Sequence, residues 1–197
     1  MDQQLEQLAQ LFLKFPGIGR RQAARFAYFV LTQPQSYVAT LAKALVEARG
    51  KAHTCSRCFR VYEGMPGTCS ICSNPARDTT QLIVVEKSQD IDAFAKTSYN
   101  GLFFVLGGLI PIVQKDVLAG THLNDLKARI AKEGTTEYEV ILAFPLTPNG
   151  DHTDQVVRET LGSYPIEISS LGRGLSTGAE LEYVDAESLS ASLKKRE

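Results

Sequence analysis

The sequence predicts an α/β protein made of successive parts: a helical N-terminal region, a cysteine knuckle, a parallel sheet flanked by helices, and a C-terminal strand and helix. Apolar residues recur at helical spacing through the first fifty residues, and all four cysteines lie between positions 55 and 72. From about residue 81, short apolar runs alternate with helical segments, as in a parallel sheet. With 197 residues, 44% hydrophobic and 22% charged, the chain is neither disordered, fibrous nor a disulfide-knotted peptide.

The first two helices are predicted by apolar stripes on either side of a proline–glycine turn. The first stripe recurs at i, i+3, i+4, i+7 and i+8 and consists of Leu5, Leu8, Ala9, Phe12 and Leu13. Pro16, Gly17 and Gly19 end this helix and turn the chain. A second helix is expected from about Arg20 to Leu31, with a buried face of Ala23, Ala24, Ala27 and Val30.

A third helix is expected after Gln33-Pro34. Ser36 is of the residue type that caps a helix N-terminus, and Gly50 is of the type that follows a C-terminus. The apolar side chains expected to turn inward are Val38, Leu41, Ala42 and Leu45.

The turn at Phe15–Gly19 has the look of a helix–hairpin–helix. Gly17 and Gly19 let the backbone approach a phosphate closely, and the N–H groups that open the next helix point toward it. The arginines that begin this helix can follow the phosphate track, so we expect DNA contacts from Gly17, Gly19, Arg20, Arg21 and Arg25. Such binding is independent of base sequence and sensitive to salt. The alternative is an ordinary glycine turn with solvated arginines.

The formal net charge of −1 conceals an uneven distribution. Residues 1–78 carry ten Lys and Arg against five Asp and Glu, whereas residues 79–197 carry eleven against seventeen. A basic front half favours a polyanion as partner, and an acidic back half favours a protein or a metal ion. Chance also produces an asymmetry of this size in a chain with this many charges.

Four cysteines form two Cys-x-x-Cys knuckles: Cys55 with Cys58, and Cys69 with Cys72. Two such knuckles complete a tetrahedral shell of four thiolates, which suits one structural Zn²⁺ per chain and leaves no open position for catalysis. The competing interpretations are disulfides, a thioredoxin-like redox pair and an iron–sulfur cluster. A reducing cytosol disfavours the first, the duplicated knuckle disfavours the second, and iron–sulfur proteins usually use other spacings.

The second half of the chain is expected to form a parallel sheet. Buried-strand runs cover residues 82–85, 102–106, 140–144 and 166–171, and helical segments lie near 89–97, near 123–133 and after Asp151. One more strand is expected over Glu180–Val184, followed by a last helix that Asp185 caps.

Acidic residues follow two of the predicted strands. Glu86 ends the first strand, and Asp151 and Asp154 come after the third. This arrangement resembles the Toprim domain of topoisomerases and primases, in which the acids hold Mg²⁺ for phosphoryl transfer.

Motifs along the whole chain resemble one family. They are Phe15-Pro16-Gly17-Ile18-Gly19, the four-cysteine knuckle with Ser73-Asn74-Pro75, Val84-Val85-Glu86 with Asp90-Ile91, Phe104-Val105-Leu106-Gly107-Gly108, and Gly178-Ala179-Glu180-Leu181-Glu182-Tyr183-Val184-Asp185. Each motif alone is weakly specific, but together and in this order they resemble the RecR family of bacterial recombination mediators.

The resemblance implies a non-enzymatic DNA repair factor. Members bind single- and double-stranded DNA as ring-like homo-oligomers, dimers or tetramers, and they act with RecO and RecF to help RecA displace single-stranded DNA-binding protein. The implied domains are a helix–hairpin–helix region (1–54), a Cys₄ zinc finger (55–78), a Toprim-like domain (79–175) and a C-terminal strand and helix in oligomer contacts (176–197). Glu86 and Asp151 are then expected to bind partner proteins rather than to catalyse.

The chain departs from the family pattern at three places: Pro145-Leu146-Thr147 stands for an Asn-Pro-Thr-like stretch, Asn149-Gly150 for a Glu-Gly pair, and Ser176 for a proline. The missing carboxylate before the glycine argues against a Mg²⁺ site. A Mg²⁺-dependent Toprim nuclease or primase-like enzyme that uses Glu86, Asp151 and Asp154 is the alternative function.

The chain is expected to be cytoplasmic and associated with the nucleoid. Its longest apolar run, residues 102–113, is interrupted by two glycines and a proline, whereas a membrane-spanning helix needs about 20 apolar residues. The first residues show no secretory signal pattern. No membrane partner is expected.

Overall fold

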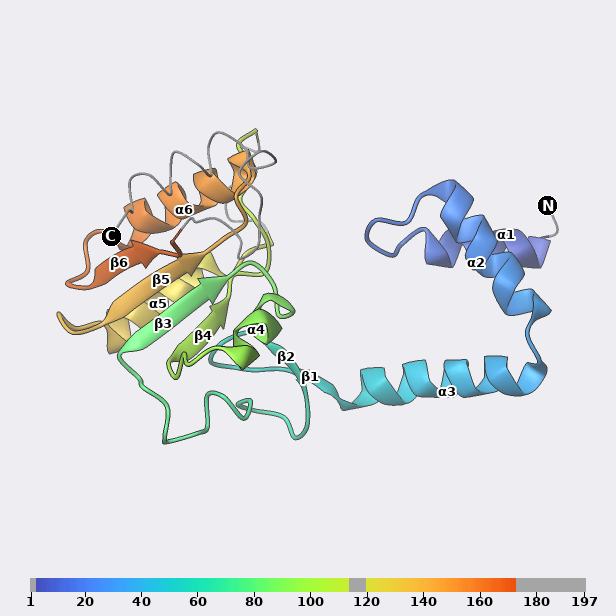
Figure 1. Ribbon diagram of the computed structural model, residues 1–197, viewed down its shortest axis with the longest axis horizontal. Helices are drawn as coiled ribbons and strands as arrows, with labels where there is room; N and C mark the ends of the chain where they lie inside the picture. Colours follow the sequence, from blue (N-terminus) through green and yellow to red (C-terminus); the bar gives the residue numbers. More distant parts are fainter. Residues whose placement is uncertain (1–2, 114–119, 173–197) are drawn as a thin grey trace, which may run out of the picture. The chain divides into compact units, whose positions relative to one another are not determined.

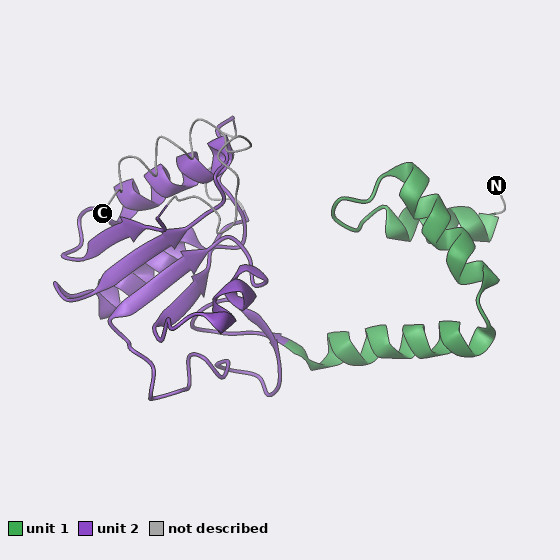
Figure 2. Cartoon of the chain, viewed as in Figure 1, with its two compact units in different colours: residues 1–52 green, residues 53–197 purple. Residues whose placement is uncertain are grey.

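The computed structural model describes residues 3–113 and 120–172 (Figure 1). The chain divides into two compact units, Met1–Ala52 and His53–Glu197 (Figure 2). The expected strand over Glu180–Val184 and the helix after it lie outside the described residues. Among the described helices, none is long and apolar enough to cross a membrane.

The first unit contains the helices α1 (Gln3–Phe12), α2 (Arg20–Thr32) and α3 (Gln35–Lys51). Helices α1 and α2 pack through a small core of Leu5, Ala9 and Ala27, with Leu8 and Phe12 at its edge. The ring of Phe12 also meets that of Phe26 edge to face, with centroids 5.8 Å apart. The two predicted amphipathic helices and the turn between them are therefore confirmed.

Helix α3 differs from the prediction at its start and on its inner face. Pro34, not Ser36, is the N-cap residue, and its carbonyl accepts from the amides of Tyr37 and Val38. The ring of Pro34 fixes a φ of −57°, which suits the residue at a helix start, so the helix begins before Ser36.

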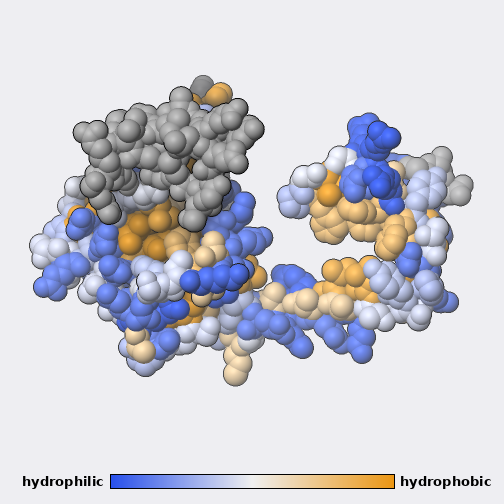
Figure 3. Space-filling view, in the orientation of Figure 1, coloured by the Kyte–Doolittle hydropathy of each residue, from blue (hydrophilic) through white to orange (hydrophobic). Residues whose placement is uncertain are grey.

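No residue of α3 is buried, and Leu45, expected to face inward, is 60% exposed. Ala42 is exposed as well. Helical spacing specifies which side chains share a face, but that face is buried only where another element covers it. Apolar atoms are consequently visible along this helix in the space-filling view (Figure 3).

The second unit is built around a parallel sheet in the order β4-β3-β5-β6. Its strands are β3 (Gln81–Val85), β4 (Leu102–Val105), β5 (Glu139–Ala143) and β6 (Glu167–Ser170). A separate two-stranded sheet pairs β1 (Ala52–Thr54) with β2 (Val61–Glu63) beside the cysteines. The four predicted parallel strands are confirmed to within one residue at each end.

Helices cover both faces of the parallel sheet (Figure 1). They are α4 (Asp90–Ala93) with the 3-10 turn η1 (Phe94–Lys96) on one face, and α5 (Leu123–Glu133) and α6 (Pro148–Leu161) on the other. The larger core joins alternate residues of the strands to α5 and α6, among them Phe104, Leu126, Ile130, Leu142 and Leu161. The residues between them, such as Ile83 and Phe103, pack on the α4 side.

Candidate nucleic-acid interface and metal centre

The hairpin between α1 and α2 presents open backbone at both glycines. Gly17 has a φ of +76°, which an L side chain rarely adopts, and an added Cβ would meet nothing within 4 Å. Gly19 has an ordinary φ of −87° and faces equally open space. Its carbonyl accepts from the Ala23 amide at 2.9 Å and so begins α2. The amides that open α2 have no side-chain cap, which leaves them available to an anion.

The predicted arginines lie on α2 directly after this turn. Arg20, Arg21 and Arg25 are all exposed. Within residues 3–113 and 120–172, none of these three guanidinium groups takes part in an ion pair. Two open glycines and three exposed cations thus lie close together in the sequence, between Gly17 and Arg25.

The four cysteines come together as their spacing predicted. Their sulfur atoms all lie within 4.8 Å of one another, and the Cys58 and Cys69 sulfurs are 3.6 Å apart. Cys55, Cys58 and Cys69 are buried and Cys72 is half-buried. The first knuckle is closed by the Phe59 amide, which donates to the Cys55 carbonyl at 3.0 Å.

This sulfur cluster fits a tetrahedral zinc ion. Zn–S bonds of about 2.3 Å place the sulfurs of a tetrahedral site about 3.8 Å apart, close to the Cys58–Cys69 separation. The crowding perturbs the thiols themselves: hydrogen bonds from Cys58 and Cys72 lower the pKa of Cys69, and the bond to Cys69 raises that of Cys58. A bound divalent cation removes the competition among these thiols for protons, because it binds all four sulfurs as thiolates.

Sequence reasoning missed how the first knuckle attaches to the parallel sheet. The Cys58 carbonyl accepts from the Val105 amide on the edge strand β4 at 2.8 Å. Phe59 has a φ of +60°, and its ring stacks on His122 with centroids 3.9 Å apart. The same ring meets Phe104 of the main core edge to face. A bulky aromatic directly after a Cys-x-x-Cys pair was the available signal.

An ionic network reinforces this attachment. Glu133, at the end of α5, accepts from Arg57 Nη2 at 3.2 Å and from Arg129 Nε at 3.0 Å through the same oxygen, Oε2. Arg129 Nη1 also lies 3.4 Å from the carbonyl oxygens of Arg57 and Phe103. Burial by itself raises the pKa of Glu133, but the charge of Arg129 and the hydrogen bonds from both arginines lower it overall.

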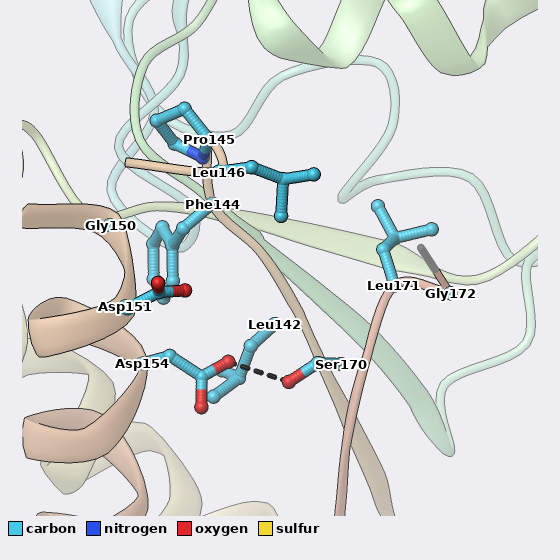
Figure 4. Close-up of a pocket in the computed structure, with 10 residues that line it drawn as sticks. All are labelled: Leu142, Phe144, Pro145, Leu146, Gly150, Asp151, Asp154, Ser170, Leu171 and Gly172. Carbon is cyan, nitrogen blue, oxygen red and sulfur yellow. Dashed lines mark hydrogen bonds between the residues drawn. The ribbon is translucent and has the colours of Figure 1, made fainter. Parts of the chain in front are cut away.

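The predicted acidic residues lie at the carboxyl edge of the parallel sheet. Glu86 directly follows β3, and its carbonyl accepts from the Gly107 amide at 2.9 Å. Asp151 and Asp154 lie on α6 and line a cavity of about 140 Å³, whose other walls come from the ends of β5 and β6 (Figure 4). Glu86 is not among the residues that line this cavity.

Asp154 is already engaged within the fold. Its Oδ1 pairs with Arg158 Nε at 2.6 Å, and its Oδ2 accepts from the Ser170 hydroxyl at 2.6 Å (Figure 4). Among the described residues, the four cysteines are the only group of three or more His, Cys, Asp or Glu that gathers closely enough to hold a metal ion. The predicted acids therefore share an edge of the sheet without forming a three-carboxylate cluster there.

Two known protein families match different parts of this chain. A family described as "RecR, helix-hairpin-helix" matches residues 5–49, and the Toprim domain family matches residues 80–172. The chain is similar to "Recombination protein RecR" of Chlorobium luteolum, at 34% identity over 98% of this chain and 95% of that protein. It is also similar to the proteins of the same name from Porphyromonas gingivalis, at 36% identity over 98% and 91% of the two chains, and Lactobacillus delbrueckii, at 32% over 98% and 96%. The chain belongs to the RecR family of recombination proteins.

Proposed function

We propose that this protein binds DNA through the α1–α2 hairpin, without cutting it, and acts as a recombination mediator. The observation that carries the proposal is the exposed turn, where two open glycines are followed by uncapped amides of α2 and by three exposed arginines that form no ion pair with the described residues. Phosphate oxygens are the ligands that such a surface recognises, and phosphate contacts alone bring no preference for base sequence. Both single- and double-stranded DNA therefore qualify as ligands.

The cysteine cluster is proposed to hold one structural Zn²⁺ per chain, bound by Cys55, Cys58, Cys69 and Cys72. Four sulfur ligands saturate the ion, so it stabilises the knuckles and takes no part in chemistry. The proposed domains follow from these roles: residues 1–54 for DNA, 55–78 for zinc, 79–175 as the Toprim-like domain and 176–197 for oligomer contacts.

A ring-like oligomer forms part of the proposal. Apolar side chains on α2 and α3 are largely exposed in the single chain, namely Phe29, Leu31, Tyr37, Leu45 and Val46. Exposed apolar side chains of this kind favour an interface with another chain. The acidic residues Glu86 and Asp151 are proposed to bind RecO or RecF, and the assembly to help RecA replace single-stranded DNA-binding protein.

The alternative, a Mg²⁺-dependent Toprim nuclease or primase-like enzyme, receives less support from the geometry. Phosphoryl transfer needs convergent carboxylates to hold the metal ions. Asp154 is paired with Arg158 and Ser170, and Asn149 stands where the family has an acid.

The test replaces Arg21 and Arg25 together by alanine. Each lost phosphate contact should reduce the slope of log affinity against log salt by about 0.7 to 0.9, and affinity should fall equally for all base sequences. Binding of a mixed-sequence oligonucleotide is measured by fluorescence anisotropy at several salt concentrations. Lys43→Ala with Arg49→Ala removes the same charge from α3 and serves as the control, which should keep the wild-type slope.

An unchanged slope in the Arg21→Ala, Arg25→Ala variant would contradict the hairpin as the DNA contact. The same preparations are incubated with labelled DNA and Mg²⁺. Cleavage by the wild type would favour the enzyme alternative over the mediator.

A further inference from the structure

We propose that Arg57, Glu133 and Arg129 are positioning residues for the metal: through them, helix α5 holds both cysteine knuckles in the geometry that binds zinc. The proposal rests on the zinc site proposed above. It predicts that Arg129, which contacts no sulfur, sets how long the ion stays bound.

The contacts connect both knuckles to α5 through a single side chain. Arg57 lies between Cys55 and Cys58 in the first knuckle, yet its Nη1 reaches the carbonyl of Cys72 in the second at 3.5 Å. Its Nη2 is held by Glu133 of α5 at 3.2 Å. A shift of Glu133 therefore moves the group that spans the two knuckles.

Arg129 fixes the positions of Glu133 and of the first knuckle. It is only 7% exposed, and its guanidinium reaches Glu133, the Arg57 carbonyl and the Phe103 carbonyl of β4. Its remaining nitrogen, Nη2, is buried without a hydrogen-bond partner among the described residues. A buried guanidinium held in this way is costly to displace, because each lost contact leaves another buried polar atom unsatisfied.

The charge of the arginine network also favours zinc binding by the thiolates. Arg57 and Arg129 share one carboxylate, so the network carries one positive charge more than its own groups neutralise. Four thiolates around Zn²⁺ carry a net charge of −2, and Arg57 lies beside them. The loaded cluster thus stabilises the Arg57 cation, and by linkage this cation stabilises the loaded cluster to the same extent.

The experiment compares zinc release by wild type, Arg129→Met and a matched control, Arg158→Met. Arg158 also pairs with an acid four residues away and donates to a strand carbonyl, that of Ile168, but its contacts join α6 to β6. Zinc transfer to an excess of a chromogenic chelator is followed at a temperature where circular dichroism shows all three proteins folded. Loss of an outer contact of this kind typically weakens metal binding by roughly 10- to 100-fold. We expect release from Arg129→Met to accelerate within that range, and release from Arg158→Met to match the wild type.

Each outcome decides between the proposals. Equal release from wild type and Arg129→Met, with zinc present in both, overturns the positioning role and leaves the zinc site standing. Equal acceleration in Arg158→Met assigns the effect to general destabilisation and also overturns it. A wild-type protein that neither contains nor takes up Zn²⁺ contradicts the zinc site itself. Where Arg129→Met does not fold, two other variants are measured in its place: Arg57→Met, and Glu133→Gln, in which the side chain keeps nearly the same size.

Discussion

At the scale of single residues, Phe59 holds a backbone conformation that bulky residues rarely adopt, and its ring compensates for the strain. A φ of +60° costs a non-glycine residue on the order of 1 to 3 kcal/mol. In return, the ring stacks on His122 and reaches Phe104 in the main core. The knuckle is attached to the sheet by a residue that local preference alone would disfavour.

The strained φ of Phe59 leads us to expect an unusual order of stability among wild type, Phe59→Ala and Phe59→Gly. Phe59→Ala loses the ring and keeps the strained φ, whereas Phe59→Gly loses the ring but adopts this φ freely. Both variants should be less stable than the wild type, and the glycine variant should be the more stable of the two by about 1 kcal/mol. Urea unfolding of the zinc-loaded proteins measures the difference. An alanine variant as stable as the glycine variant would show that the strain is absent in solution.

The stability that Glu133 contributes is expected to depend on pH. Its pKa is lowered in the folded protein, so its ion pairs contribute stability that is complete above the unfolded pKa of about 4.3 and is lost as the pH falls through the lower folded value. The difference in unfolding free energy between wild type and Glu133→Gln should be constant from pH 7 to about 5 and shrink below about 4.3. Zinc content is measured in both proteins at each pH, so that acid release of the metal is separated from the titration of Glu133.

Urea unfolding of both proteins at each pH measures this difference. The wild type should lose its higher stability only below about pH 4.3. A difference that stays constant to pH 3 would mean that the carboxylate of Glu133 is not what stabilises the network.

At the scale of elements, the α1–α2 hairpin separates two roles of glycine. Gly17 is needed for its positive φ, whereas Gly19 has an ordinary φ and only needs to leave space in front of the α2 amides. We therefore propose that Gly17 serves the fold and that Gly19 serves the proposed DNA contact.

Alanine substitutions should distinguish the two roles. Gly17→Ala should lower stability by about 1 kcal/mol because of the strained φ. Gly19→Ala should change stability by less than about 0.5 kcal/mol, as at other open surface positions, but its methyl group should obstruct the phosphate and weaken DNA binding. Thermal unfolding and anisotropy on the same preparations provide both readouts. Full DNA affinity in Gly19→Ala would place the phosphate elsewhere.

At the scale of the whole molecule, the two units carry different chemistry. The exposed arginines and the open glycines lie in the unit Met1–Ala52, whereas the cysteine cluster and the acids at the sheet edge lie in the unit His53–Glu197. This separation follows the uneven charge of the sequence, which is basic before residue 79 and acidic after it. DNA binding and partner binding should therefore be separable by mutation.

Glu86→Ala tests that separation. Its backbone contact to Gly107 does not involve the side chain, so the fold should persist. DNA affinity and its salt slope should equal those of the wild type, while binding to RecO, measured by calorimetry, should weaken. Glu86→Gln separates the charge from the shape of the side chain. A Glu86→Ala protein with normal RecO affinity would remove this residue from the partner surface.

The sequence by itself determined the features that depend on local pattern. The two Cys-x-x-Cys pairs predicted a cluster that the structure contains, and apolar periodicity located α1, α2 and the four parallel strands. The motifs in their order were sufficient to indicate the family. Such features are encoded within a few neighbouring residues, so no knowledge of distant contacts is needed to recognise them.

Only the tertiary structure decided which side chains meet across long stretches of sequence. Asp154 was a candidate metal ligand until the fold placed it against Arg158 and Ser170, and Leu45 was a candidate core residue until α3 proved to have no buried side chain. Arg57 and Glu133 are separated by 76 positions, and nothing in either neighbourhood predicts their contact. The physical reason is that burial and charge pairing depend on what packs against a side chain, and that is set by the assembled fold rather than by local sequence.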